Sequence, residues 1–230
     1  MDVSPSFRTG VILPAAGSGI RFGGDEKKQF RLLDGQPLVV ATAKLFIDLA
    51  SVSEIVVVVP GSEIDKTREL FSAVDFPVQI VAGGATRNAS VRLGFAALGA
   101  VDLVLIHDAV RPFTSLPKIL EVLNVAHTFG AAALATGVTD TLRKVDRGIL
   151  RATIDRVDVV QMQTPQVFSK TVLARALELS ADDSATDEVM LVQNSGTDVW
   201  FVQGEATNIK ITKASDWALG LAILEGRRKE

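Results

Sequence analysis

The chain has 230 residues, 47% of them hydrophobic, which is enough for a substantial core and argues against intrinsic disorder. Its 24 basic and 27 acidic residues are spread along the sequence with a net charge of −3, which excludes the basic face of a nucleic-acid or membrane-surface protein. With no cysteine, the chain has no disulfide, thiol nucleophile or thiolate metal site. We expect a cytoplasmic protein of one domain, residues 1–230, with no nucleic-acid or membrane partner.

Short apolar runs alternate with segments of helical periodicity over the first 136 residues. This alternation predicts an α/β fold with a doubly wound, mostly parallel sheet covered by helices, whose ligands bind beyond the carboxyl ends of the strands. Pro37 suits a first helical turn and Ser62 a helix cap. Strands are predicted at residues 10–13, 54–59, 78–81, 103–107 and 131–136, and helices at 37–50, 62–73, 88–98 and 115–129.

The pattern changes at residues 138–156, where polar and apolar residues alternate about a turn at Asp146, Arg147 and Gly148. This is typical of a β-hairpin with glycine in a left-handed conformation. Both faces of the hairpin are too polar for the main core, so it should project as an arm. A hairpin that cannot bury itself usually contacts a partner subunit.

The remaining segments are predicted to complete the sheet and its helical cover. Residues 159–168 should return to the sheet, and an amphipathic helix at 215–228 should turn Trp217, Leu221 and Leu224 inward. Helices are predicted at 169–179 and 187–194, and strands at 199–202 and 208–212.

A glycine-rich turn, LPAAGSGIRF, follows the first predicted strand at residues 13–22. Gly17 and Gly19 would let backbone N–H groups close on phosphate oxygens, Arg21 could bind the same anion, and Lys28, next to Lys27, adds charge at this edge. A plain turn with surface lysines is the alternative. A nicotinamide dehydrogenase is disfavoured, because the third glycine of the dinucleotide motif and its acidic partner are missing.

The motif HDAVRPF, residues 107–113, follows another apolar strand and places Asp108 at the ligand edge. Mg²⁺ is bound by one or two carboxylates together with phosphate oxygens, so we predict Asp108 as a metal ligand. The alternatives are a helix or turn cap for Asp108 and a structural pairing of Arg111 with it. His107 is predicted to be a hydrogen-bonded core residue and not a base.

The second glycine turn, AGGATRNASV, spans residues 82–91. Gly83 and Gly84 allow a flat base to lie against the backbone, Arg87 can reach a phosphate, Asn88 could cap a helix, and Ser90 can hydrogen-bond a base edge. An ordinary strand-to-helix turn explains the same residues equally well.

The motif NIKIT, residues 208–212, places Lys210 opposite Ile209 and Ile211 in the predicted strand. A lysine in an otherwise buried strand is costly unless it meets an anion, so we favour a functional role for Lys210. Asp187 and Glu188 could cap a helix or bind metal, and the cap is the preferred interpretation.

Together with KKQF, TPQVF and TDE, these motifs closely resemble the 2-C-methyl-D-erythritol 4-phosphate cytidylyltransferase family, over about residues 11–217. The resemblance implies a Rossmann-like fold, Mg²⁺, a homodimer with exchanged arms, and a step of non-mevalonate isoprenoid biosynthesis. The reaction implied is that of CTP with 2-C-methyl-D-erythritol 4-phosphate, which gives 4-CDP-2-C-methyl-D-erythritol and pyrophosphate.

The resemblance also assigns roles to residues of this chain. Arg21, Lys28 and Lys210 would be catalytic around the α-phosphate, and Asp108 would hold Mg²⁺. The acceptor sugar phosphate would be bound by Thr141 and Arg156 from the neighbouring subunit, with Arg111 and Thr164 nearby. The nucleotide would be bound by Pro14, Ala15, Ala16, Gly17, Gly19, Gly83, Gly84, Ala85, Arg87, Ser90, Asp108 and Ala109.

The chain departs from the family pattern at two positions and leaves two other functions open. Ala85 and Thr207 stand where acidic residues are common, and Thr207 puts a second protein carboxylate near the metal in doubt. Ribitol-5-phosphate cytidylyltransferase shares HDAVRPF and NIKIT, although its opening turn is of the LAGG type. A non-catalytic nucleotide-binding module is disfavoured, because every cationic position that the chemistry needs is present.

Overall fold

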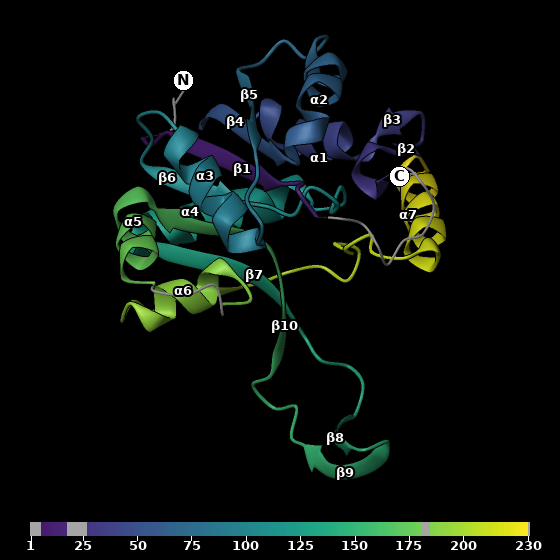
Figure 1. Cartoon of the computed structure of the whole chain (residues 1–230). Helices are drawn as coiled ribbons and strands as arrows, with labels where there is room; N and C mark the ends of the chain where they lie inside the picture. Colours follow the sequence, from purple (N-terminus) through teal and green to yellow (C-terminus); the bar gives the residue numbers. More distant parts are fainter. Residues whose placement is uncertain (1–5, 18–26, 181–184, 230) are drawn as a thin grey trace.

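The computed structural model describes residues 6–17, 27–180 and 185–229. Its centre is a seven-stranded sheet in the order β11-β7-β10-β6-β1-β4-β5, in which only β10 runs antiparallel to its neighbours (Figure 1). The mostly parallel α/β sheet is therefore confirmed. Its strands are β1 (Thr9–Pro14), β4 (Val52–Val59), β5 (Val78–Ala82), β6 (Leu103–Ile106), β7 (Ala131–Gly137), β10 (Val160–Ser169) and β11 (Trp200–Gln203).

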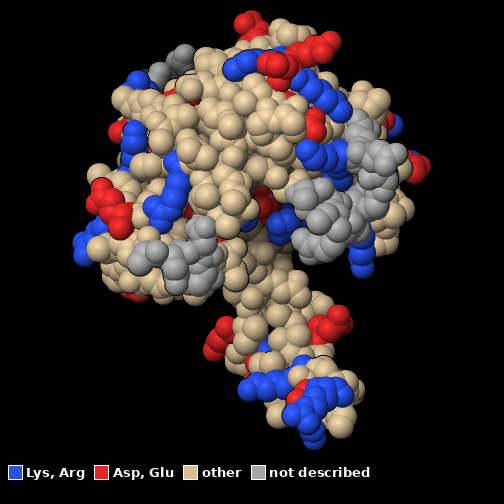
Figure 2. All heavy atoms as spheres, viewed as in Figure 1, with Lys and Arg blue, Asp and Glu red and all other residues tan. Residues whose placement is uncertain are grey.

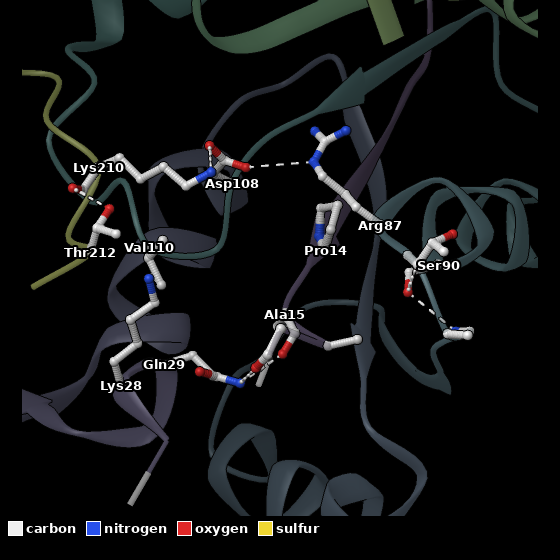
Figure 3. Close-up of a pocket in the computed structure, with 15 residues that line it drawn as sticks. Pro14, Ala15, Lys28, Gln29, Arg87, Ser90, Asp108, Val110, Lys210 and Thr212 are labelled. Atoms are coloured by element: carbon white, nitrogen blue, oxygen red, sulfur yellow. Dashed lines mark hydrogen bonds and ion pairs between the residues drawn. The ribbon is translucent and has the colours of Figure 1, made fainter. Parts of the chain in front are cut away.

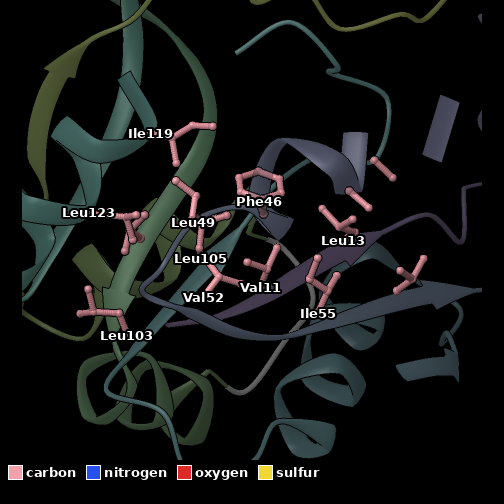
Figure 4. Close-up of a cluster of buried hydrophobic side chains, with 14 of the residues drawn as sticks. Val11, Leu13, Phe46, Leu49, Val52, Ile55, Leu103, Leu105, Ile119 and Leu123 are labelled. Carbon is pink, nitrogen blue, oxygen red and sulfur yellow. The ribbon is translucent and has the colours of Figure 1, made fainter. Parts of the chain in front are cut away.

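Helices cover both faces of this sheet because both faces of its strands are apolar. Val11 and Leu13 of β1 pack with Phe46 of α1 in a first cluster that includes residues of α2 and α4 (Figure 4). Ile12, from the opposite face of β1, packs in a second cluster with residues of α3, α5 and α6. The helices are α1 (Leu38–Ile47), α2 (Ile64–Phe71), α3 (Arg87–Ala97), α4 (Leu116–Phe129), α5 (Lys170–Leu179), α6 (Glu188–Asn194) and α7 (Ala214–Arg227).

The strand order reverses beside β1, and this reversal positions the site. From β1 the chain moves outward to β4 and β5, and then crosses back to place β6 on the other side of β1. Connections leave the carboxyl ends of β1 and β6 in opposite directions, which opens a crevice there. The loops that follow these two strands begin at Ala15 and His107.

The predicted hairpin arm is present. β8 (Leu142–Asp146) and β9 (Ile149–Ile154) form a separate two-stranded sheet that projects from the body (Figure 1). Arg147 and Gly148 in its turn both have positive φ, at 50° and 80°, which is the backbone of a tight hairpin turn. Exposed Lys and Arg side chains gather toward the far end of the arm, at positions 143, 144, 147 and 151 (Figure 2).

The structure corrects the predicted strand at residues 208–212 and one face of α7. The segment 208–212 has no strand conformation, and Ile211 N–H instead donates one hydrogen bond to Val110 O, at 3.0 Å. In α7, Trp217 and Leu224 pack against the cluster around Phe113 as predicted, but Leu221 is 45% exposed. A Cβ on Gly220 of the same helix would lie 3.1 Å from Phe113 Cζ, so α7 packs closely on Phe113 where it lacks a side chain.

Three predicted helix starts also differ. Pro37 is the N-cap of α1 and pairs in a short hairpin, β2 (Leu32–Leu33) with β3 (Gln36–Pro37), that was not predicted. Ser62 lies in a 3-10 turn, η3 (Gly61–Glu63), and does not cap α2. The cap of α3 is Thr86, whose hydroxyl accepts from Ala89 N–H, and not Asn88. Within the described residues, no helix has the length and hydropathy needed to cross a membrane.

Candidate functional site

A cavity of about 670 Å³ lies at the carboxyl ends of β1, β5 and β6, where the crevice was expected (Figure 3). Gln29, Thr86, Val110 and Thr212 line it without having been predicted. Of the predicted site residues, the cavity is lined by Pro14, Ala15, Ala16, Gly17, Lys28, Gly84, Ala85, Arg87, Ser90, Asp108 and Lys210. Gly19 and Arg21 lie outside the described residues.

The first glycine turn, which follows β1, is held by Gln29 of the 3-10 turn η2 (Lys28–Phe30). The Gln29 side chain is buried, and its amide donates to Ala15 O at 2.8 Å and to Gly17 O at 3.3 Å. The motif KKQF contained this residue, but a buried glutamine gives no signal in composition or periodicity. Gln29 therefore fixes the carbonyl groups of Ala15 and Gly17, while Ala15 N–H donates to Val58 O at 2.7 Å.

The two glycine turns pack against each other. A Cβ on Gly83 would lie 2.6 Å from Ala16 Cβ and 2.9 Å from Ser90 Oγ, so no other residue fits there without movement. The Ser90 hydroxyl accepts from Gly84 N–H at 3.2 Å and donates to Thr86 O at 2.9 Å. Its hydrogen bonds therefore serve the turn itself, while Gly84 faces the cavity.

Asp108 is the centre of charge in the cavity. Its Oδ2 lies 3.0 Å from Lys210 Nζ and 3.1 Å from Arg111 Nε, and its Oδ1 lies 3.9 Å from Arg87 Nε. Burial alone would raise the pKa of Asp108, but Lys210, Arg87 and Arg111 together hold that pKa well below its ordinary value. The carboxylate is therefore ionised at neutral pH.

The two lysines come from opposite ends of the chain. Lys28 Nζ donates to Ile211 O at 2.9 Å, and Ile211 follows Lys210 in the chain. Figure 3 shows Lys28 and Lys210 on the same side of the cavity. Lys210 lies on an irregular segment, and burial of Ile211 anchors that segment to the fold. Lys27 pairs with Glu63 at 2.8 Å. Lys28, from the 3-10 turn η2, and Lys210, from an irregular segment and not a strand, are thus brought to one wall.

Arg111 and Thr164 lie behind the cavity and do not line it. Arg111 pairs with Asp108 and donates to Asn208 O at 2.7 Å, which is the structural alternative that the sequence left open. Thr164 is buried, and its hydroxyl accepts from Asp108 N–H at 3.0 Å. Ala109, predicted to bind nucleotide, is 1% exposed in the core, and its carbonyl accepts from Thr42 Oγ1.

His107 is a hydrogen-bonded core residue, as predicted. It is fully buried, with Nε2 at 2.9 Å from Arg111 O and Nδ1 at 3.0 Å from Thr164 Oγ1. Burial lowers the pKa of His107 to about 4, so the ring is neutral at neutral pH.

The start of α6 contacts Arg87, which lines the cavity. Asp187 caps this helix by accepting from Met190 N–H at 3.0 Å, so the preferred cap interpretation is confirmed. Glu188 is fully buried, and its Oε1 lies 2.6 Å from Arg87 Nη1. Burial raises the pKa of Glu188 and acts against the charged form of Arg87, but Glu188 and Asp108 raise the pKa of Arg87 overall.

Thr141 and Arg156 lie on the arm and do not line the cavity. Arg156 lines a second hollow of about 630 Å³ at the base of the arm and donates to Thr139 O. The fold of one chain therefore does not bring these two residues to the cavity wall formed by Asp108 and Lys210.

Comparison with known proteins identifies the family. The family model described as 2-C-methyl-D-erythritol 4-phosphate cytidylyltransferase matches residues 9–226. The chain belongs to this family. The members of this family are cytidylyltransferases, a class of nucleotidyltransferase, and act in isoprenoid biosynthesis.

Individual relatives with the same name match this chain over most of their length. The 2-C-methyl-D-erythritol 4-phosphate cytidylyltransferase of Salinibacter ruber is 40% identical, with 93% of this chain and 91% of that protein covered. That of Solibacter usitatus is 38% identical, with coverages of 94% and 96%. The crystal structure of the enzyme from Thermus thermophilus superposes with a TM-score of 0.80 at 32% identity, covering 95% of this chain and 99% of the other.

Proposed function

We propose that this protein transfers CMP from CTP to 2-C-methyl-D-erythritol 4-phosphate, giving 4-CDP-2-C-methyl-D-erythritol and pyrophosphate. The observation that carries the proposal is the convergence of Lys28, Lys210 and Asp108 beside a glycine loop at the sheet's switch point. The names of the relatives, which together span nearly the whole chain, support the choice of nucleotide and acceptor.

The cations of the cavity would act on the phosphorus that undergoes substitution. The acceptor phosphate oxygen attacks the α-phosphorus in line, pyrophosphate leaves, and negative charge accumulates on the five-coordinate centre. Lys28 and Lys210 would stabilise that charge, and we expect Arg21 to join them. The attacking phosphate is already an anion, so positioning and charge supply most of the catalysis and no base is needed.

The residues at Asp108 fit a divalent cation such as Mg²⁺. Asp108 is an ionised oxygen ligand, and its Oδ1 is met by Arg87 only at 3.9 Å, beyond hydrogen-bonding distance. A single carboxylate suits Mg²⁺, which takes one or two carboxylates together with phosphate oxygens. When bound, the cation would neutralise the phosphate charge, and Asp108 would hold it beside Lys210.

We further propose that residues 1–230 act as one cytoplasmic nucleotidyltransferase domain that dimerises through the arm of residues 138–156. Thr141 and Arg156 of the arm would then reach the sugar phosphate in the neighbouring subunit's cavity. Arg111 and Thr164 would act from behind the wall by fixing Asp108. The arm supports this proposal because it exposes apolar side chains, with Val145 at 63% and Leu150 at 68%.

An acceptor screen tests the reaction, base and substrate together. Purified protein is incubated with Mg²⁺, one nucleoside triphosphate and either 2-C-methyl-D-erythritol 4-phosphate or ribitol 5-phosphate, and pyrophosphate release is measured. We expect release with CTP and the methylerythritol phosphate. Release only with ribitol 5-phosphate would identify the other cytidylyltransferase, and no release with any pair would favour a binding module.

Replacement of Lys28 or Lys210 by alanine tests the catalytic assignment. Because each ammonium group would act on charge that develops in the transition state, turnover should fall on the order of a hundredfold or more. Circular dichroism and thermal unfolding should stay near those of the parent protein. Lys118→Ala is the matched control, since Lys118 pairs with Glu121 on the surface of α4. Near-normal turnover of Lys28→Ala would remove Lys28 from the mechanism.

A further inference from the structure

Glu188 is a buried carboxylate that the proposed reaction does not use. It is the first residue of α6, has no exposed surface, and lies outside the cavity lining. Its Oε1 meets Arg87, whereas Oε2 is buried without a hydrogen-bond partner among the described residues. Burying a half-satisfied carboxylate costs stability, and an apolar residue of similar size would avoid that cost. Since Glu188 does not add to stability, its role must lie in its contact with Arg87.

The carboxylate is held at a fixed point. Asp187, the preceding residue, caps α6 and also accepts from Gln166 Nε2 of β10 at 3.1 Å. Asn88 of α3 donates to Ala185 O at 2.9 Å. Since the start of α6 is tied to both β10 and α3, Glu188 is a rigid anchor for the side chain that it binds.

Arg87 lies between two carboxylates. Its Nη1 is 2.6 Å from Glu188 Oε1, while its Nε is 3.9 Å from Asp108 Oδ1 (Figure 3 shows the contact with Asp108). An arginine freed from Glu188 would close this gap, because a direct guanidinium–carboxylate contact is among the strongest charge-assisted hydrogen bonds. Such a contact would occupy Oδ1, while Lys210 and Arg111 already occupy Oδ2.

We propose that Glu188 is a positioning residue that holds Arg87 off Asp108 and so keeps Oδ1 available to the divalent cation that accompanies the triphosphate. This inference rests on the proposed function, because it concerns the cation of the same site. Glu188 acts through Arg87 and touches neither substrate nor metal.

The test compares Glu188→Gln with the double variant Arg87→Met/Glu188→Gln. Mn²⁺ serves as the probe, and its binding is followed by the electron paramagnetic resonance signal of the free ion, with an α,β-methylene analogue of CTP at saturation. Glu188→Gln keeps the shape of the side chain but removes the charge that holds Arg87 away from Asp108, so Mn²⁺ affinity should fall about tenfold or more. The double variant lacks the competing guanidinium and should recover most of the lost Mn²⁺ affinity, with the analogue at a concentration that saturates each variant because Arg87 also lines the cavity.

Glu205→Gln is the matched control, because Glu205 is a partly buried carboxylate that binds Ser115 away from the cavity. The Mn²⁺ affinity of this variant should equal that of the parent protein. Unchanged Mn²⁺ binding in Glu188→Gln, an equal loss in the double variant, or no Mn²⁺ binding by the parent protein would each overturn the inference. Cytidylyl transfer by the parent protein is measured separately. Normal transfer with unchanged Mn²⁺ binding in Glu188→Gln would reject this inference and leave the proposed function standing.

Discussion

At the scale of single residues, the hydrogen bonds behind Asp108 have defined directions. Arg111 O can only accept, so the proton of neutral His107 lies on Nε2. The His107 Nδ1 must then accept from the Thr164 hydroxyl, whose oxygen is left to accept from Asp108 N–H. This series of hydrogen bonds fixes the backbone of Asp108 and requires His107 to stay neutral. A buried histidine thus contributes to the site without touching it.

The neutral state of His107 makes stability depend on pH. The folded pKa of about 4 lies below the ordinary 6.5, so the unfolded chain gains a proton first as the pH falls from 6.5 toward 4. Between pH 7 and pH 5, the free energy of unfolding of the parent protein should therefore fall by about 2 kcal/mol more than that of His107→Gln. Urea unfolding at each pH measures the difference.

Asp108 does not interfere in this window, because its pKa is lowered and the stability it contributes is lost only below the ordinary value of 3.8. His127→Gln is the control, since His127 lies exposed on α4. Parallel pH profiles for the parent protein and His107→Gln would show that His107 is not the titrating group.

At the scale of elements, loops and the arm contribute the side chains that the sheet positions. β1 and β6 fix where the first glycine turn and the segment with Asp108 begin, but the 3-10 turn η2 and an irregular segment bring Lys28 and Lys210 to the same wall. Like the short β2–β3 hairpin, the two strands of the arm pair only with each other, but nearly all residues of the arm are exposed. A two-stranded hairpin is marginal alone, so its function depends on what it contacts.

The arm variant Arg156→Ala should weaken mainly the binding of the sugar phosphate. Loss of a charge-assisted hydrogen bond to a phosphate should raise the KM for the acceptor about tenfold or more, with the KM for CTP little changed. Steady-state kinetics with each substrate varied in turn measures both values. Arg151→Ala is the control, since Arg151 lies on the same arm but pairs with Asp146. A change confined to the KM for CTP would show that Arg156 of the arm does not bind the sugar phosphate.

At the scale of the whole molecule, the proposed site is complete only in a dimer. One chain supplies the cavity, whereas Thr141 and Arg156 belong to the arm, which projects from the body (Figure 1), and do not line that cavity. The exposed apolar residues of the arm, such as Leu150, would be covered by a second copy.

Analytical ultracentrifugation should therefore find twice the chain mass of 24.5 kDa for the parent protein. Leu150→Asp should shift the protein toward the monomer, because burying the introduced carboxylate in the interface would be costly. In the same variant, the rate of transfer to the acceptor should fall in proportion to the fraction of dimer that is lost. Leu219→Asp, at an exposed position of α7, should do neither. A fully active monomeric parent protein would contradict the exchange of arms.

Most of the elements could be predicted because their periodicity is strong. The apolar β-branched strands and the hairpin turn at Arg147 and Gly148 were found from local sequence. The segment 208–212 was misread because alternation of Ile209, Lys210 and Ile211 also arises when a coil buries one isoleucine against the core. Leu221 was misplaced because α7 covers only one edge of the fold and needs a narrow apolar stripe.

By itself, the sequence determined the order of strands and helices, the two glycine turns, and the residue types that meet at the ligand edge. These follow from local periodicity, backbone freedom at glycine, and the rule that parallel strands end at one edge. Only the tertiary structure decided which groups pair: Arg111 with Asp108, Gln29 with the first glycine turn, and Arg87 with Glu188. Such contacts join residues that are distant in the chain, and their distances depend on how helices and coils pack, which no local pattern specifies.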